Sequence, residues 1–139
     1  MKYFAASFLI ICCLSVITVH SQCLKYETEN IELVGTIYSK VFAGPPNYKS
    51  IKAGDRKEMA TILKLKSSVC TSADDDPRSF NVAETDIRQI QLVITSPEIW
   101  RTIRKNRGKL FRAKGTLFHR HTGYHRTKVL LAVTDLETI

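Results

Sequence analysis

Five stretches of alternating apolar and polar residues, with one helix-like stretch before the fourth, restrict the fold of this chain more than any other feature. A period of two places every second side chain on the same face of a β-strand. The predicted strands cover residues 31–42, 60–66, 87–95, 109–121 and 127–136. This order, β-β-β-α-β-β, is that of the OB-fold, a small five-stranded barrel. We therefore expect an all-β domain with one helix and an OB-like barrel, with an ordinary antiparallel β-sandwich fragment as the alternative.

The helix and the loops have local signals of their own. Ser96 is a good N-cap, Pro97 suits the first helical position, and Gly108 is the expected C-terminal stop. The GPPNY run at 44–48 must be a loop, because two prolines cannot serve a sheet. Residues 71–81 are polar and rich in turn formers, which predicts an exposed loop.

Two similar motifs lie on the first and fourth predicted strands. Gly35 begins the motif GTIY and Gly115 begins the motif GTLF. A glycine in the middle of a strand allows the sharp coiling that a barrel corner needs. Since the first and fourth strands of an OB barrel meet to close it, both glycines are expected at the closure.

The N-terminus has the pattern of a secretory signal peptide. Lys2 precedes an uncharged, mainly apolar run at 5–19, which is too short for the ~30 Å hydrocarbon core of a membrane. Val19 and Ser21 are small residues at the positions that signal peptidase reads, so cleavage is expected between Ser21 and Gln22. Residues 1–21 are then the signal and 22–139 a single domain. An uncleaved membrane anchor and a lipoprotein are the alternatives.

Cleavage leaves two of the four cysteines, Cys23 and Cys70. An even pair in an exported protein predicts one disulfide, with two free thiols as the alternative. Neither cysteine has the local spacing of a redox or zinc motif.

Positive charge is concentrated in the C-terminal part of the chain. The net charge is +8, and residues 99–134 contain no Asp or Glu. A composition with 44% hydrophobic and 24% charged residues excludes global disorder. Because export disfavours nucleic acid as the normal partner, we expect an anionic glycan, a lipid head group or an acidic protein of the envelope.

Several motifs are similar to those of a known family. The GPPNY run, Ser50-Ile51 and Gly54-Asp55 resemble one signature, and the GTLF motif with Thr122-Gly123, His125 and Thr127 resembles a second. Both belong to a bacterial exported family called domain of unknown function 4431. The resemblance implies a small periplasmic or secreted domain and supplies no activity.

Two loops are the expected binding surface, because the loops between strands one and two and between strands four and five flank the usual binding face of an OB-fold. Tyrosines are suited to anchor a partner and arginines to attract an anionic one. The predicted contact residues are Asn47, Tyr48, Arg120, Tyr124, Arg126 and Lys128. The alternative for Tyr48 is a structural plug at one end of the barrel.

A metal site is a second possibility. His119, His121 and His125 fall within seven residues, and imidazoles can hold Zn²⁺ or Cu²⁺. Arg120 and Arg126 oppose a cation there, and histidines in a hairpin loop are commonly just solvated.

Catalytic motifs are not apparent. The chain has no nucleophile elbow, HExxH motif or phosphate-binding loop. Asp55 and Glu58 could serve a metal-dependent nuclease only within a carboxylate cluster that the sequence does not visibly build. We expect a non-catalytic binding domain without a cofactor, and the alternatives are an inhibitor or immunity-type protein against an envelope-targeting enzyme and a metal-binding hairpin.

Overall fold

The computed structural model describes residues 22–139, so the predicted signal peptide lies outside the described residues. The elements are β1 (Leu24–Lys25), β2 (Ile31–Ala43), the 3₁₀ turn η1 (Ile51–Ala53), β3 (Lys57–Ser72), β4 (Glu84–Val93), α1 (Pro97–Lys105), β5 (Leu110–His119) and β6 (Val129–Thr138). In this part of the chain no helix has the length and apolar character needed to cross a membrane.

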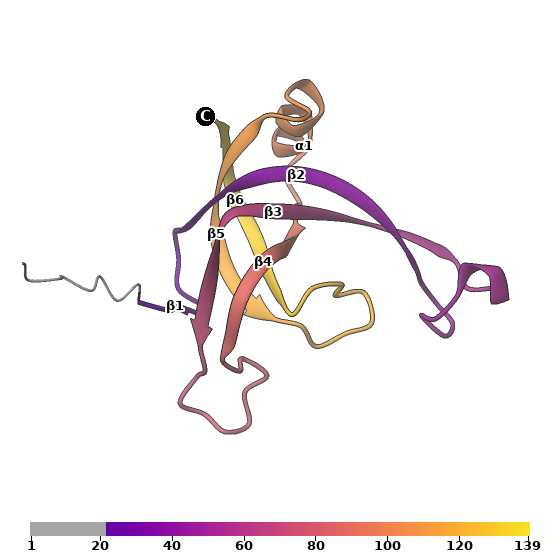
Figure 1. Cartoon of the computed structure of the whole chain (residues 1–139), viewed down its shortest axis with the longest axis horizontal. Coiled ribbons are helices and arrows are strands. Elements are labelled where there is room, and N and C mark those ends of the chain that lie inside the picture. The colour runs from indigo at the N-terminus through magenta and orange to yellow at the C-terminus, as the bar shows by residue number, and fades with distance from the viewer. Residues whose placement is uncertain (1–21) are drawn as a thin grey trace, which may run out of the picture.

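Five strands close into a barrel (Figure 1). The hydrogen-bonded order is β3-β2-β5-β6-β4, and a further pairing of β3 with β4 completes the circuit. All neighbours are antiparallel except β4 and β6, which run parallel. This order, with α1 between β4 and β5, is that of the OB-fold and confirms the predicted architecture.

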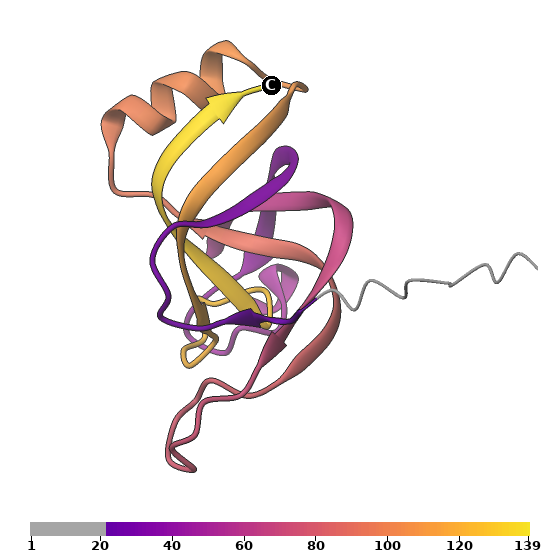
Figure 2. The same cartoon turned by 90° about the vertical axis from the view of Figure 1, so that its left-hand side faces the viewer.

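The core fills the barrel, because alternate residues of each strand point inward. Leu63, Ile90, Leu117 and Leu131 are fully buried and come from four different strands. From the helix, Ile99 joins the same cluster. Burial of one such side chain contributes about 2 kcal/mol. Figure 2 shows α1 at one end of the barrel, above β5 and β6.

The two predicted closure glycines lie where backbones approach most closely. β2 pairs with β5, so that Ile31 lies opposite Gly115 and Gly35 lies opposite Phe111. A Cβ atom on Gly35 would lie 2.2 Å from the carbonyl oxygen of Lys64, and one on Gly115 would lie 2.0 Å from that of Ala132. Only glycine fits at either position.

Several boundaries differ from the prediction. β3 has 16 residues where the alternation predicted 60–66, because it pairs with both β2 and β4 beyond the alternating segment. α1 ends at Lys105 with Asn106 as its C-cap; Gly108 adopts a φ of 78° in the turn that follows. β5 ends at His119 instead of His121. The predicted loop at 71–81 begins later, after Ser72, and its Asn81 is buried.

The predicted disulfide is present. Cys23 and Cys70 are joined with a sequence separation of 47, and β1 runs parallel to β3 directly beyond the bridge. Closing a loop of that length stabilises the fold by roughly 4 kcal/mol in the chain-entropy view. The bridge fixes the start of the described chain to the end of β3.

Candidate binding site between two loops and strand β4

The loop between β2 and β3 is folded around the carboxylate of Asp55. Its Oδ1 accepts hydrogen bonds from the backbone and side-chain amides of Asn47, at 2.9 and 3.2 Å, and its Oδ2 accepts from the backbone N–H groups of Lys49 and Ser50, both at 2.8 Å. The backbone donors at Ser50 and Lys49 lower the pKa of Asp55 below its usual value. Asp55 is 5% exposed, so its role is to hold the loop's shape.

Tyr48 joins this loop to the loop between β5 and β6. Its backbone has a φ of 57°, a left-handed conformation that turns the side chain toward the second loop. The ring meets Tyr124 edge-on, with 5.7 Å between centroids. A Cβ atom on Gly123 would lie 2.9 Å from the Tyr48 ring, so the glycine makes room for it.

Arg126 is the second link between the loops. Its guanidinium lies 5.2 Å from the ring centroid of Phe42 and 5.5 Å from that of Tyr48, distances typical of cation–π contacts. Nη1 donates to the carbonyl oxygen of Ala43 at 3.0 Å. Nη2 is buried, and no acceptor among residues 22–139 reaches it.

Gln91 of β4 holds the β5–β6 loop through its side-chain amide. On the outer face of the barrel, Gln91 of β4 lies between Ile62 of β3 and Leu130 of β6. Its side-chain nitrogen donates to the carbonyl oxygen of Tyr124 at 3.2 Å, and its side-chain oxygen accepts from the backbone N–H of Arg126. Ile62 and Leu130 are fully buried although neither belongs to the core cluster inside the barrel.

A hollow of about 320 Å³ opens between this loop and β4. Its lining includes four cationic side chains and a single carboxylate, that of Asp86, which pairs with Arg88 at 2.9 Å. Lys128 pairs with Glu84 at 2.9 Å. Arg120 and Arg126 are then the cations of the hollow with no ion-pair partner among the described residues.

Glu84 is the fixed acid at the edge of this surface. Besides Lys128, it contacts Nε2 of His119 at 3.0 Å. The His119 contact is the main cause, and the Lys128 contact the second, of a pKa for Glu84 below its usual value. Nδ1 of His119 faces the carbonyl oxygen of Arg120 at 3.2 Å. With acceptors on both sides, the ring can donate at both nitrogens only when it is protonated.

The structure brings most of the predicted contact residues together, but in different roles. Tyr48 and Tyr124 touch, and Arg120, Arg126 and Lys128 line one hollow. Arg126 and Lys128 are held by contacts within the chain, whereas Arg120 is exposed. Asn47 is exposed as well, although its amide group is tied to Asp55.

The predicted three-histidine site is not assembled. Among residues 22–139 no group of three or more His, Cys, Asp or Glu side chains is placed to hold a metal ion. A strand over 109–121 would have placed His119 and His121 on one face, but β5 ends at His119 and His121 lies in the loop beyond it. The backbone N–H of His121 donates to Nδ1 of His125 at 3.1 Å, while burial and then the neighbouring His121 lower the pKa of His125.

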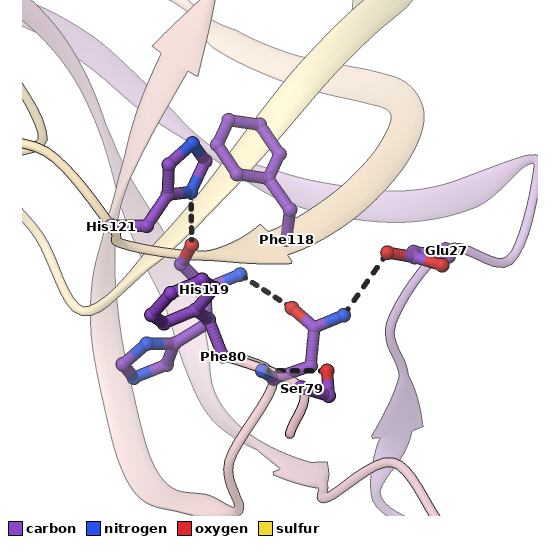
Figure 3. Close-up of a pocket in the computed structure, with 7 residues that line it drawn as sticks. Glu27, Ser79, Phe80, Phe118, His119 and His121 are labelled. Atoms are coloured by element: carbon purple, nitrogen blue, oxygen red, sulfur yellow. Dashed lines mark hydrogen bonds between the residues drawn. The ribbon is translucent and has the colours of Figure 1, made fainter. Parts of the chain in front are cut away.

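Both His119 and His121 line a second hollow, of about 330 Å³ (Figure 3). Figure 3 shows the His121 ring beside Phe118, apart from the ring of His119. Asn81 accepts from the backbone N–H of His119 at 3.0 Å and donates to Glu27 at 3.2 Å and to Asp74 at 2.8 Å. Asn81 therefore holds the β3–β4 loop against β5.

Sequence reasoning missed Gln91, Glu84 and Asn81. Each acts on a residue that is 35 or more positions away, so no local spacing marks it. The one available signal was a glutamine within the otherwise apolar stretch QLVI of a predicted strand.

A family model matches the C-terminal part of the chain. Residues 89–137 match the family model described as a domain of unknown function, DUF4431. The match runs from β4 to β6 and includes the β5–β6 loop, which confirms the resemblance inferred from the motifs for this part of the chain. No curated protein and no solved structure matches the chain.

Proposed function

We propose that this chain, whose residues 89–137 carry a DUF4431 domain, is an exported, non-catalytic binding protein that holds an anionic group of an envelope ligand or an acidic protein. The binding site is the hollow between β4 and the β5–β6 loop. One observation carries the proposal: this hollow has four cationic side chains and a single, already paired, carboxylate in its lining. A site with that imbalance attracts negative charge and repels cations.

Preorganisation supports the same site. Gln91, Arg126 and Tyr48 tie the loop to β4 and to the β2–β3 loop before any ligand arrives. A surface that is already ordered loses little conformational entropy on binding. In the same loop, Tyr124 is 50% exposed and offers a flat contact surface.

The non-catalytic part of the proposal rests on what the nearby carboxylates do. Asp55 accepts four hydrogen bonds within its own loop, and Glu84 pairs with His119 and Lys128. Neither is available as a free acid or base. Export rests on the signal-like N-terminus and on the disulfide, since disulfides persist in oxidising compartments.

Arg120 provides the direct test, because it is an exposed cation of the hollow with no ion-pair partner among residues 22–139, whereas the exposed Arg88 and Lys128 are paired. Dextran sulfate and poly-L-glutamate serve as anionic probes in calorimetric titrations, with neutral dextran as the blank. Arg120→Glu should weaken the binding of at least one anionic probe by about tenfold or more.

The matched control is Lys66→Glu, an equal change of charge at an exposed position of β3 outside the hollow. Affinity should change there by less than about threefold, through long-range charge alone. Equal losses in both variants would mean unspecific attraction to a basic protein, and the proposed site would be wrong. Reversal of Arg126 is a poorer test, because it also breaks the link between the loops.

A further inference from the structure

Strand β2 extends beyond the barrel and leaves one of its edges open. It pairs with β5 only from Ile31 to Thr36, but with β3 as far as Ala43. Within the described chain no strand pairs with the other edge of Ile37–Ala43, where only the carbonyl oxygen of Ala43 is engaged, by Nη1 of Arg126. Figure 1 shows β2 and β3 continuing as a two-stranded arm past the barrel, with α1 above β2. Alternate residues of this segment direct their N–H and C=O groups to the open edge.

A groove lies at the start of this edge, where Ile37, Tyr38 and Ser39 line it. It has a volume of about 490 Å³, the largest of the hollows described above, and lies between the arm and the C-terminal half of α1. Its apolar lining comes from both sides: Met59 and Ile37 from the arm, Trp100 and Ile103 from the helix. Met59 is 72% exposed, and its cross-strand neighbour Val41 is 47% exposed.

The charge of the groove has one sign. Arg104 and Arg107 line it, and no carboxylate does. On the same helix Glu98 is engaged by Arg101 at 2.7 Å, so it does not neutralise these two arginines. The position of the arginines near the helix C-terminus also suits the helix dipole, but that role requires neither an apolar groove beside them nor an open strand edge.

From this arrangement we infer that the groove binds an extended segment of a partner protein by strand addition to β2. The partner's backbone pairs with the open edge of Ile37–Phe42, short of the Ala43 carbonyl that Arg126 engages. An apolar side chain of the partner covers Met59 and Trp100, and its acidic side chains meet Arg104 and Arg107. Main-chain pairing supplies affinity in such complexes and the alternating side chains supply specificity.

The open edge favours a peptide over the other anionic partners. A lipid head group or a sulfated glycan could satisfy the two arginines, but neither presents a row of N–H and C=O groups at strand spacing. The groove is also separate from the hollow at the β5–β6 loop, since the two share no lining residue. The inference therefore stands or falls independently of the proposed function.

Trp100 makes occupation of the groove measurable, because it is the only tryptophan of the chain. The probe is a capped heptapeptide of alternating Glu and Val, matched in length to Ile37–Ala43, added to the full chain with its disulfide formed. The peptide should change the Trp100 fluorescence saturably. Arg104→Glu with Arg107→Glu should weaken its binding by about tenfold or more.

The matched control is Lys105→Glu with Lys109→Glu, which changes the charge equally at neighbouring positions outside the groove. It should change the affinity by less than about threefold. A near-ultraviolet circular dichroism spectrum of each variant verifies that the fold is intact. Equal losses in the two double variants would overturn the inference.

Backbone methylation tests the pairing itself. Two further peptides carry N-methyl groups on the odd or on the even amides. Strand addition predicts that one peptide loses binding and the other retains it, because only alternate amides face β2. Equal binding of the two would exclude strand addition. If Trp100 responds to anionic lipid vesicles but not to the heptapeptide, the groove binds a membrane and the inference is wrong. If Trp100 responds to an increase in protein concentration alone, the groove binds a second copy of this chain and the inference is likewise wrong.

Discussion

The guanidinium of Arg126 lies over the ring of Tyr48, 5.5 Å from its centroid, and so joins two loops that are 78 residues apart in the sequence. The same side chain donates to the carbonyl oxygen of Ala43, so it holds the first part of the β2–β3 loop at two points. The two loops therefore form one continuous surface through this residue.

Replacing Arg126 should lower the free energy of unfolding and loosen the connection between the two loops. Arg126→Ala removes a hydrogen bond and two cation–π contacts, and we expect a loss of about 1–2 kcal/mol in the free energy of unfolding. Arg126→Lys keeps the charge but not the planar group, so it should recover only part of the loss. Urea denaturation measures both. An Arg126→Ala variant as stable as Arg120→Ala would show that the link is unimportant.

Asp55→Asn tests the folding of the β2–β3 loop. Both carboxylate oxygens accept two N–H groups each, so an asparagine in either orientation places its own NH₂ against donors. The backbone amides of Asn47, Lys49 and Ser50 should exchange with deuterium about tenfold faster or more. Asp75→Asn, at an exposed position, is the control. Unchanged protection of these three amides would contradict the assigned role.

Gly115→Ala tests barrel closure. The added Cβ would lie 2.0 Å from the backbone oxygen of Ala132, which cannot move without opening the pairing of β5 with β6. We expect a loss of about 3 kcal/mol or more in the free energy of unfolding, or failure to fold. The neighbouring Thr116→Ala should cost far less, because Thr116 points outward. Thermal denaturation measures the stability of the two variants. Similar melting temperatures would show that the backbones at Gly115 and Ala132 do not approach as closely as described.

The contacts of Glu84 with His119 and Lys128 predict a pH dependence. The pKa of Glu84 is lowered from 4.5 by His119 and then by Lys128, so the unfolded state binds its proton at a higher pH than the folded state does. The contribution to stability is therefore complete above pH 4.5 and is lost as the pH falls through the folded pKa. Glu84→Gln should be less stable than the natural chain near pH 7, and the difference should shrink below pH 4.5.

Chemical denaturation at several pH values measures this difference. Glu29→Gln, at an exposed position, should show no comparable gap at any pH. A gap for Glu84→Gln that stays constant from pH 7 to pH 3 would mean that packing, and not charge, explains the effect.

The fold could be read from the sequence because its signals are local. Alternation in five segments, the Ser96-Pro97 helix start and the paired GTIY and GTLF motifs each depend on neighbours in the chain. The two-residue β1 has no such signal, since it exists only as a partner of β3 beside the disulfide. The length of β3 was underestimated for the same reason: pairing partners extend a strand past its own pattern.

The sequence predicted which loops form the candidate site, but not the contacts that each of its residues makes. Both loops were correctly predicted to form one surface, because OB topology alone brings them to the same side. Which residues of that surface are held by internal contacts and which stay exposed depended on partners far away in the sequence. Lys128 could not be known to pair with Glu84, nor Arg126 to lie on Tyr48, before the strands were arranged.

The sequence by itself determined the strands, the helix, the pairing of Cys23 with Cys70 and the positive charge, because periodicity and composition are properties of the chain. Only the tertiary structure decided which cations are neutralised and which stay exposed. Ion pairs and stacking contacts form at distances of a few ångströms, and the barrel sets those distances by register between strands far apart in the chain. The open edge of β2 is of the same kind, since it exists only because β5 ends its pairing at Thr36 while β3 continues to Ala43.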